Sequence, residues 1–151
     1  MSFVVLYDAN VLYPSTLRDL LIRIAGAGLV QAKWTEQILD EVFRNIRKNR
    51  PELSAGQLER TRSLMLTSVR DCLATDNLKD FPAEALRQWD IDPKDADDFI
   101  SDQIGLDAKV VWSCVQQIAN TWRNPPGTIG DVLASLERCG LVQSVAALRA
   151  L

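Results

Sequence analysis

Acidic residues at the ends of expected elements are the side chains best placed to do chemistry. Asp8 follows an apolar stretch, Glu41 lies at the border of an apolar helical stripe, and Asp76 and Asp80 follow a second strand-like stretch. Carboxylates that gather at the carboxyl edge of a sheet stay ionised only if a cation joins them, and oxygen ligands favour a hard metal such as Mg²⁺ or Mn²⁺. Such a metal activates water and stabilises charge on a phosphate.

Each of these acids also has an ordinary structural interpretation. An Asp directly after a strand is commonly a turn residue or a helix cap, and an acid such as Glu41 on a helix is commonly a solvated charge. Asp76 and Asp80 have the same alternative, as turn or N-cap residues before Pro82. The spacing alone leaves both a metal site and a set of caps open.

Composition limits the remaining chemistry. The chain has 151 residues, of which 47% are hydrophobic and 25% charged, which is typical of one globular domain with a core. The absence of histidine excludes catalysis by Ser/His or Cys/His pairs and zinc sites with histidine ligands. Cys72, Cys114 and Cys139 have no CxxC spacing, so a zinc or redox motif is not expected.

Charge is distributed unevenly along the chain, although the formal net charge is only −3. Residues 1–70 hold ten Lys and Arg against seven Asp and Glu, and four of these cations, Arg44, Arg47, Lys48 and Arg50, fall within seven residues. This run is either a solvated helix end or a surface that contacts RNA phosphates. The sequence shows no signal peptide and no apolar stretch of membrane-spanning length, so we expect a cytoplasmic protein without a membrane partner.

The hydrophobic pattern predicts an α/β fold. Residues 2–7 are apolar on both faces, as in the centre of a parallel sheet, and Asp8 would lie at the carboxyl end of that strand, where open sheets keep their sites. Residues 29–32 are a brief strand or a turn, and residues 71–75 are a candidate short strand. Helices are expected after each cap or opening residue along the chain, which are Thr16 with Asp19, Thr35, Ser54 with Gln57, Pro82, Asp92 with Pro93, Asp107, and Thr128 with Asp131, and a short helix ends the chain.

Three motifs, taken in their order along the chain, resemble the PIN-domain family. They are Asp8-Ala-Asn-Val-Leu-Tyr-Pro-Ser, Glu41 in Leu-Asp-Glu-Val-Phe-Arg-Asn, and Thr75-Asp-Asn-Leu-Lys-Asp-Phe-Pro. Within that family the chain is similar to the VapC-like toxin ribonucleases, over about residues 3–100. The resemblance implies a three-layer fold, with a small parallel sheet flanked by helices. It implies a PIN-like domain over residues 1–104 and a helical C-terminal extension over residues 105–151.

The resemblance also implies roles for particular residues. Asp8, Glu41 and Asp80 match the catalytic acids that hold Mg²⁺ or Mn²⁺, with Asp76 as an auxiliary ligand candidate and Asn10, Thr75 and Asn77 as supporting residues. The basic run Arg44, Arg47, Lys48 and Arg50 would bind RNA. A protein antitoxin is the expected partner, and a homodimer is a further candidate. The apolar stripe of the third helix and the tail with Trp112 and Trp122 would serve either partner, although such stripes more commonly form the core of the monomer.

The chain departs from the family pattern between about residues 70 and 75, where an acidic segment, a helix and a buried strand are expected and the two flanking motifs are joined almost directly. Asp71 is a poor substitute, because a residue at the start of a strand points away from the edge where the site lies. Two main functions follow: a metal-dependent endoribonuclease, or a catalytically disabled PIN-like domain that keeps antitoxin binding or dimerisation. A helical interaction domain whose acids are all caps is the third alternative.

Overall fold

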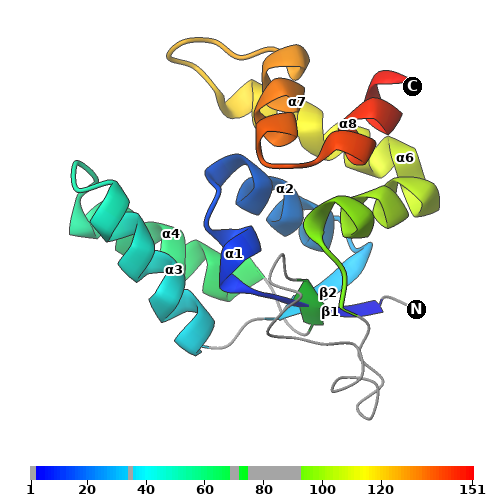
Figure 1. Cartoon of the computed structure of the whole chain (residues 1–151). Helices are drawn as coiled ribbons and strands as arrows, with labels where there is room; N and C mark the ends of the chain where they lie inside the picture. Colours follow the sequence, from blue (N-terminus) through cyan, green and yellow to red (C-terminus); the bar gives the residue numbers. More distant parts are fainter. Residues whose placement is uncertain (1–2, 34–35, 69–71, 75–92) are drawn as a thin grey trace.

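The computed structural model describes residues 3–33, 36–68, 72–74 and 93–151 (Figure 1). This part of the chain is mostly helical and contains a small parallel sheet, as the α/β prediction requires. In chain order the elements are β1 (Phe3–Tyr7), α1 (Ala9–Leu12), α2 (Ser15–Gly26), β2 (Val30–Lys33), α3 (Glu36–Asn49), α4 (Ala55–Ser68), β3 (Cys72–Ala74), α6 (Ala96–Thr121), α7 (Ile129–Arg138) and α8 (Val142–Arg149).

The sheet has the strand order β2-β1-β3, and both outer strands run parallel to β1. The continuously apolar strand is therefore central, as predicted, and its residues Val5 and Tyr7 are buried. The ambiguous stretch at residues 29–32 forms a strand, with Phe3 opposite Val30, and β3 places Tyr7 opposite Ala74. Because parallel strands end at the same edge, Asp8 leaves the sheet where β3 also ends.

Helices cover the sheet and extend the core away from it. Figure 1 shows α2 between the sheet and α7, while α3 and α4 lie together to one side. The apolar face of α2 is fully buried, and α6 and α7 pack against this helix. Both α7 and α8 pack in turn on α6, so one continuous apolar core links the strands to the C-terminal helices.

Two predicted helix starts are correct in detail. The Ser54 hydroxyl accepts a hydrogen bond from Gln57 N at 3.1 Å, and the Gln57 side chain accepts one from Ser54 N at 3.0 Å, so a capping box precedes α4. Thr128 and Asp131 form the same reciprocal pair before α7. The caps expected at Thr35 and Pro82 lie outside the described residues.

Two other predicted starts are wrong. The N-cap of α2 is Pro14, without a side-chain capping bond, and Thr16 is buried, with its hydroxyl 2.8 Å from the hydroxyl of Ser135 in α7. The hydroxyl of Thr16 thus serves a contact between helices, which the local pattern could not reveal. The helix expected to open at Asp92 begins later, because Asp95 is its N-cap and accepts from Asp98 N at 2.8 Å.

Helix α6 joins two segments that the sequence predicted as separate helices. Its backbone leaves the helical conformation at Asp107, whose carboxylate accepts a bond from Val110 N at 3.2 Å and so caps the second segment as expected. The proposed division of the chain between residues 104 and 105 lies beside this kink and stays a prediction. Among the described helices, none combines the length and apolarity needed to cross a membrane.

Candidate metal centre

Asp8 lies at the junction between the central strand and the first helical turn. It occupies the N-cap position of α1 with extended backbone angles, and its carbonyl oxygen accepts from Val11 N at 3.2 Å and Leu12 N at 3.3 Å. Its side chain makes no capping bond, although capping is the ordinary role of an Asp at this position. The half-buried carboxylate instead accepts a hydrogen bond from the Asn10 amide at 3.4 Å.

The residue behind Asp8 is fixed from two directions. Tyr7 is fully buried, and its hydroxyl donates to the carbonyl oxygen of Leu21 in α2 at 3.1 Å. Its ring meets Phe99 of α6 edge to face, with the centroids 6.0 Å apart and the planes at 83°. Because Asp8 follows directly in the chain, packing of Tyr7 against α2 and α6 holds the backbone that carries the carboxylate.

Arg18 holds the other end of the α1 turn. Its guanidinium donates to the carbonyl oxygens of Leu12 at 3.1 Å and Tyr13 at 3.3 Å, which are acceptors left open where α1 ends. Burial lowers the pKa of Arg18, and the charge of Asp19 opposes that shift. A guanidinium nevertheless stays protonated, so it supplies a permanent cation to the negative end of this turn.

Glu41 lies on α3, which packs against α1. The end of α3 is tied to α1 by Asn49, whose amide donates to the Tyr13 hydroxyl at 2.9 Å. Glu41 itself is exposed. Hard divalent cations prefer oxygen ligands, and Asp8 and Glu41 both carry carboxylate oxygens. The chemistry of these two residues therefore suits the predicted Mg²⁺ or Mn²⁺.

The structure does not bring a complete ligand set together within the residues it describes. In that part of the chain, no group of three or more His, Cys, Asp or Glu side chains is placed to hold a metal ion. Asp8 and Asn10 are neighbours, while Asp76, Asp80, Thr75, Asn77 and the alternative Asp71 lie outside the described residues. The metal ligation by Asp8, Glu41 and Asp80 therefore stays a prediction.

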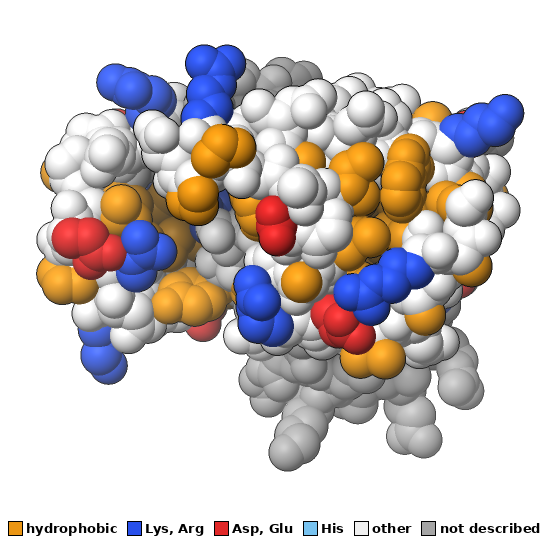
Figure 2. Space-filling view, turned by 90° about the horizontal axis from the view of Figure 1, so that it is seen from above, with side chains coloured by type: hydrophobic (Ala, Val, Ile, Leu, Met, Phe, Trp, Pro, Cys, Tyr) orange, Lys and Arg blue, Asp and Glu red, His pale blue; other side chains and the backbone are white. Residues whose placement is uncertain are grey.

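The predicted RNA-binding cations are all exposed on α3 or directly after it. Arg50 forms an ion pair with Glu52, whereas Arg44, Arg47 and Lys48 form none with any described residue. Helical spacing puts Arg44 and Lys48, three and seven residues after Glu41, on the same face as that acid, and Arg47 lies off this face. Figure 2 shows Lys and Arg side chains over the lobe formed by α3 and α4.

Three residues with structural roles were not identified from the sequence: Tyr7 and Arg18, which hold the two ends of the α1 turn, and Asp97 in the first turn of α6. A tyrosine within an aliphatic strand is a usable signal for Tyr7, since its hydroxyl needs a partner when buried. Arg18 and Asp97 carried no such signal. The two tryptophans proposed as a partner surface, Trp112 and Trp122, are half-buried and pack against the core, so a role in partner binding stays a prediction.

Comparison with known proteins bears on the C-terminal part of the chain. Residues 96–150 match a protein-family model described as the VapC50 C-terminal domain, and this segment runs from α6 to the end of α8. The match suggests a VapC-family toxin-like protein, although a PIN domain itself is not detected. No curated protein matches the chain, and no solved structure does.

Proposed function

We propose that this chain is a metal-dependent endoribonuclease, the toxin of a toxin–antitoxin pair, built on a three-layer PIN-like fold. The observation that carries the proposal is the placement of Asp8. It follows the central strand of a parallel sheet, at the edge where such sheets keep their sites, and its carboxylate is not used to cap the helix that it precedes. The VapC-type match of residues 96–150 supports the toxin part of the proposal.

The residues divide the work as follows. Asp8, Glu41 and Asp80 would hold Mg²⁺ or Mn²⁺, with Asp76 as an auxiliary ligand and Thr75 and Asn77 supporting Asp80. Such a cation, when bound, supplies a water nucleophile at neutral pH and offsets the negative charge that develops on an RNA phosphodiester during hydrolysis. The Asn10 amide, which donates to the Asp8 carboxylate, orients that carboxylate.

Cations beside Glu41 would hold the RNA backbone. Arg44 and Lys48 share the exposed face of α3 with Glu41, so phosphates bound there lie next to the proposed ligand. Arg50 contributes less, because Glu52 already neutralises it. Replacing Arg44 or Lys48 by Gln should in each case lower the slope of log K for binding of single-stranded RNA against log salt concentration by about 0.7. Cleavage should fall less in Arg47→Gln than in Arg44→Gln or Lys48→Gln, because Arg47 lies off the face that carries Glu41.

A catalytically disabled domain is the second candidate, and one observation favours it. Helix α4 ends at Ser68 and β3 begins at Cys72, so no room exists between them for the acidic segment that the family resemblance predicts. A protein that lacks this segment would keep the fold and an antitoxin-binding or dimerising surface without hydrolysis.

Titration of the wild-type chain with Mn²⁺ and Mg²⁺ by calorimetry, alongside cleavage of a structured RNA, tests the proposal. We expect Asp8→Asn to weaken metal binding by at least the 10- to 100-fold typical of outer-shell losses and to abolish cleavage. Asp40→Asn is the matched control, because the Asp40 carboxylate is exposed and pairs with Arg62 at 2.7 Å. Binding without cleavage would identify the disabled domain, and no metal binding by the wild type would overturn the metal centre.

A further inference from the structure

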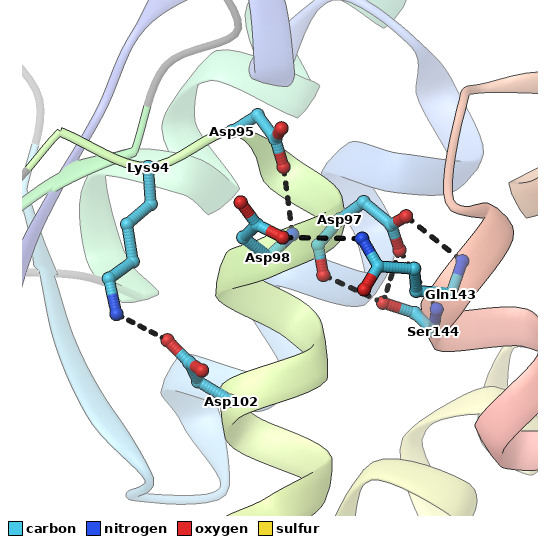
Figure 3. Close-up of polar contacts among 7 residues, drawn as sticks. All are labelled: Lys94, Asp95, Asp97, Asp98, Asp102, Gln143 and Ser144. Carbon is cyan, nitrogen blue, oxygen red and sulfur yellow. Dashed lines mark hydrogen bonds and ion pairs between the residues drawn. The ribbon is translucent and has the colours of Figure 1, made fainter.

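The last helix of the chain begins against a carboxylate that belongs to another helix. Asp97, in the first turn of α6, accepts hydrogen bonds from Gln143 N at 2.9 Å, from Ser144 N at 2.8 Å and from the Ser144 hydroxyl at 2.7 Å (Figure 3). The N-cap residue of α8 itself, Leu141, supplies no side-chain bond. Asp97 therefore caps α8 from 46 to 47 residues away in the chain.

The electrostatics of this contact are favourable from both sides. Asp97 lies in the first turn of α6 and at the start of α8, so the positive ends of two helix dipoles face one carboxylate. The Ser144 hydroxyl is completely buried beside it. The neighbouring acids have other partners, since Asp95 caps α6 and Asp98 accepts from the Gln143 side chain at 3.3 Å.

The same turn of α6 also contacts the strand that leads to the candidate metal centre. Phe99 lies two residues after Asp97, is buried, and packs edge to face on Tyr7. Tyr7 precedes Asp8 directly, and its hydroxyl is anchored on α2. The first turn of α6 is thus bonded to α8 through Asp97 and packed on β1 through Phe99.

We propose that Asp97 is a positioning residue for the candidate metal centre. By fastening α8 to the first turn of α6, it keeps Phe99 seated on Tyr7 and so limits the movement of the backbone at Asp8. The C-terminal helix then supports a carboxylate that it does not touch. The metal-binding part of this inference rests on the proposed function, while the mechanical link between α8 and α1 does not.

Amide hydrogen exchange and Mn²⁺ titration of the full chain test the link with three variants. Asp97→Asn removes the charge that caps α8, and Ser144→Ala removes only the hydroxyl donor. Asp102→Asn is the matched control, because Asp102 is exposed on the same helix and pairs with Lys94, away from α8. Because Ser144→Ala leaves the backbone N–H bonds to Asp97 in place, this variant can still be measured if Asp97→Asn fails to fold.

In Asp97→Asn and Ser144→Ala we expect faster exchange at Val145 in α8 and also at Val11 and Leu12, whose N–H groups bond to Asp8. Mn²⁺ affinity should fall by about 2- to 30-fold, the range seen when a mutation acts through a packed network. The Asp102→Asn control should change neither quantity. Faster exchange both in α8 and at Val11 and Leu12, together with weaker Mn²⁺ binding by the variants, would support the positioning role.

The contrary outcomes separate the two proposals. Two outcomes would overturn the positioning role and leave the nuclease proposal intact. One is faster exchange in the variants that is confined to α8. The other is a wild type that binds Mn²⁺ and variants that bind it with the same affinity. If the wild type binds no Mn²⁺ but both regions exchange faster, the proposed function fails and the link between α8 and α1 is supported.

Discussion

Helices of the C-terminal segment begin at side-chain caps, whereas the first two helices of the chain begin without them. Asp95 caps α6, Thr128 caps α7, and Asp97 caps α8 from a neighbouring helix. The N-cap positions of α1 and α2 are Asp8 and Pro14, and neither makes a side-chain capping bond. The C-terminal segment therefore satisfies N–H groups at its helix starts with side chains, and for α8 that side chain comes from a neighbouring helix. In the N-terminal segment, Arg18 instead donates to carbonyl oxygens at the opposite, C-terminal end of α1.

This difference separates polar side chains whose bonds cap a helix from Asp8, which occupies an N-cap position without making the capping bond. In the C-terminal segment each capping carboxylate or hydroxyl satisfies backbone N–H groups at a helix start, which stabilises the fold directly. Asp8 has the position of a cap without the bond, at an edge of the sheet suited to a site. An acid that forgoes a stabilising bond worth about 1 kcal/mol is a better functional candidate than one that makes it.

The largest expected effect concerns the turn that joins α6 to α7. A Cβ atom added at Gly127 would lie 2.6 Å from Cε3 and 2.8 Å from Cβ of Trp122, so Gly127→Ala must displace the indole or the turn. We expect a loss of about 1–3 kcal/mol in the free energy of unfolding, measured by urea denaturation.

A second glycine in the same segment gives the control for this prediction. At Gly105, on α6, an added Cβ meets nothing within 4 Å. Gly105→Ala should therefore stabilise the protein by up to about 1 kcal/mol, the helix-propensity gain over glycine. Equal changes in the free energy of unfolding for the two substitutions would show that the turn at Trp122 rearranges to accept a Cβ atom at Gly127.

In both segments the sequence alone predicted some helix starts correctly and others wrongly. Capping boxes such as Ser54 with Gln57 and Thr128 with Asp131 depend on a three-residue spacing, and both were predicted correctly. The same kind of spacing at Thr16 was misleading, because its hydroxyl bonds to a residue 119 positions away. Local signals predict elements and their starts, but they carry no information about contacts made across the fold.

The candidate site shows the same limit. The motif of Asp8, the central strand and the helix that carries Glu41 could be predicted, since each depends on a short apolar pattern. The roles of Tyr7 and Asp97 could not, because both depend on where α6 packs. Whether Asp80 meets Asp8 depends on such a placement too, and the sequence supports it only through the family resemblance.

An intermediate effect is expected when the medium is acidified. Burial raises the pKa of Asp97, but the hydrogen bonds from Gln143 and Ser144 lower it by more than burial raises it. The pKa of Asp97 in the folded protein therefore lies below the ordinary value for Asp. A depressed pKa stabilises the fold above about pH 4, the ordinary value for Asp, and this stabilisation is lost as the pH falls through the folded-state pKa. Asp97→Asn should cost about 1–2 kcal/mol at pH 7, and less as the pH falls.

Denaturant unfolding of wild type and Asp97→Asn between pH 7 and pH 3 measures this difference. Lys94, Asp95, Asp98 and Asp102 are the charged neighbours on the α6 side, and the residues that face Asp97 from α8, Gln143 and Ser144, are uncharged. Asp102→Asn therefore reports how the local charge alone affects the pH profile. A gap between wild type and Asp97→Asn that stays constant across this range would show that the capping bonds do not depend on ionisation of Asp97.

The smallest expected effect lies at the junction between the two segments, where the hydroxyls of Thr16 and Ser135 bond at 2.8 Å. Thr16→Val and Ser135→Ala each remove one partner, and a neutral hydrogen bond of this kind contributes about 1 kcal/mol net. A double-mutant cycle on the free energy of unfolding should give a coupling of about 0.5–1 kcal/mol, because either single substitution already abolishes the bond. Thr16 is buried and Ser135 is half-buried. Thr16→Val removes the buried hydroxyl together with its bond, whereas Ser135→Ala leaves that hydroxyl buried without this partner. Ser135→Ala should therefore lower the free energy of unfolding more than Thr16→Val does. A coupling near zero would mean that apolar packing of α2 on α6 and α7 holds the segments together without this bond.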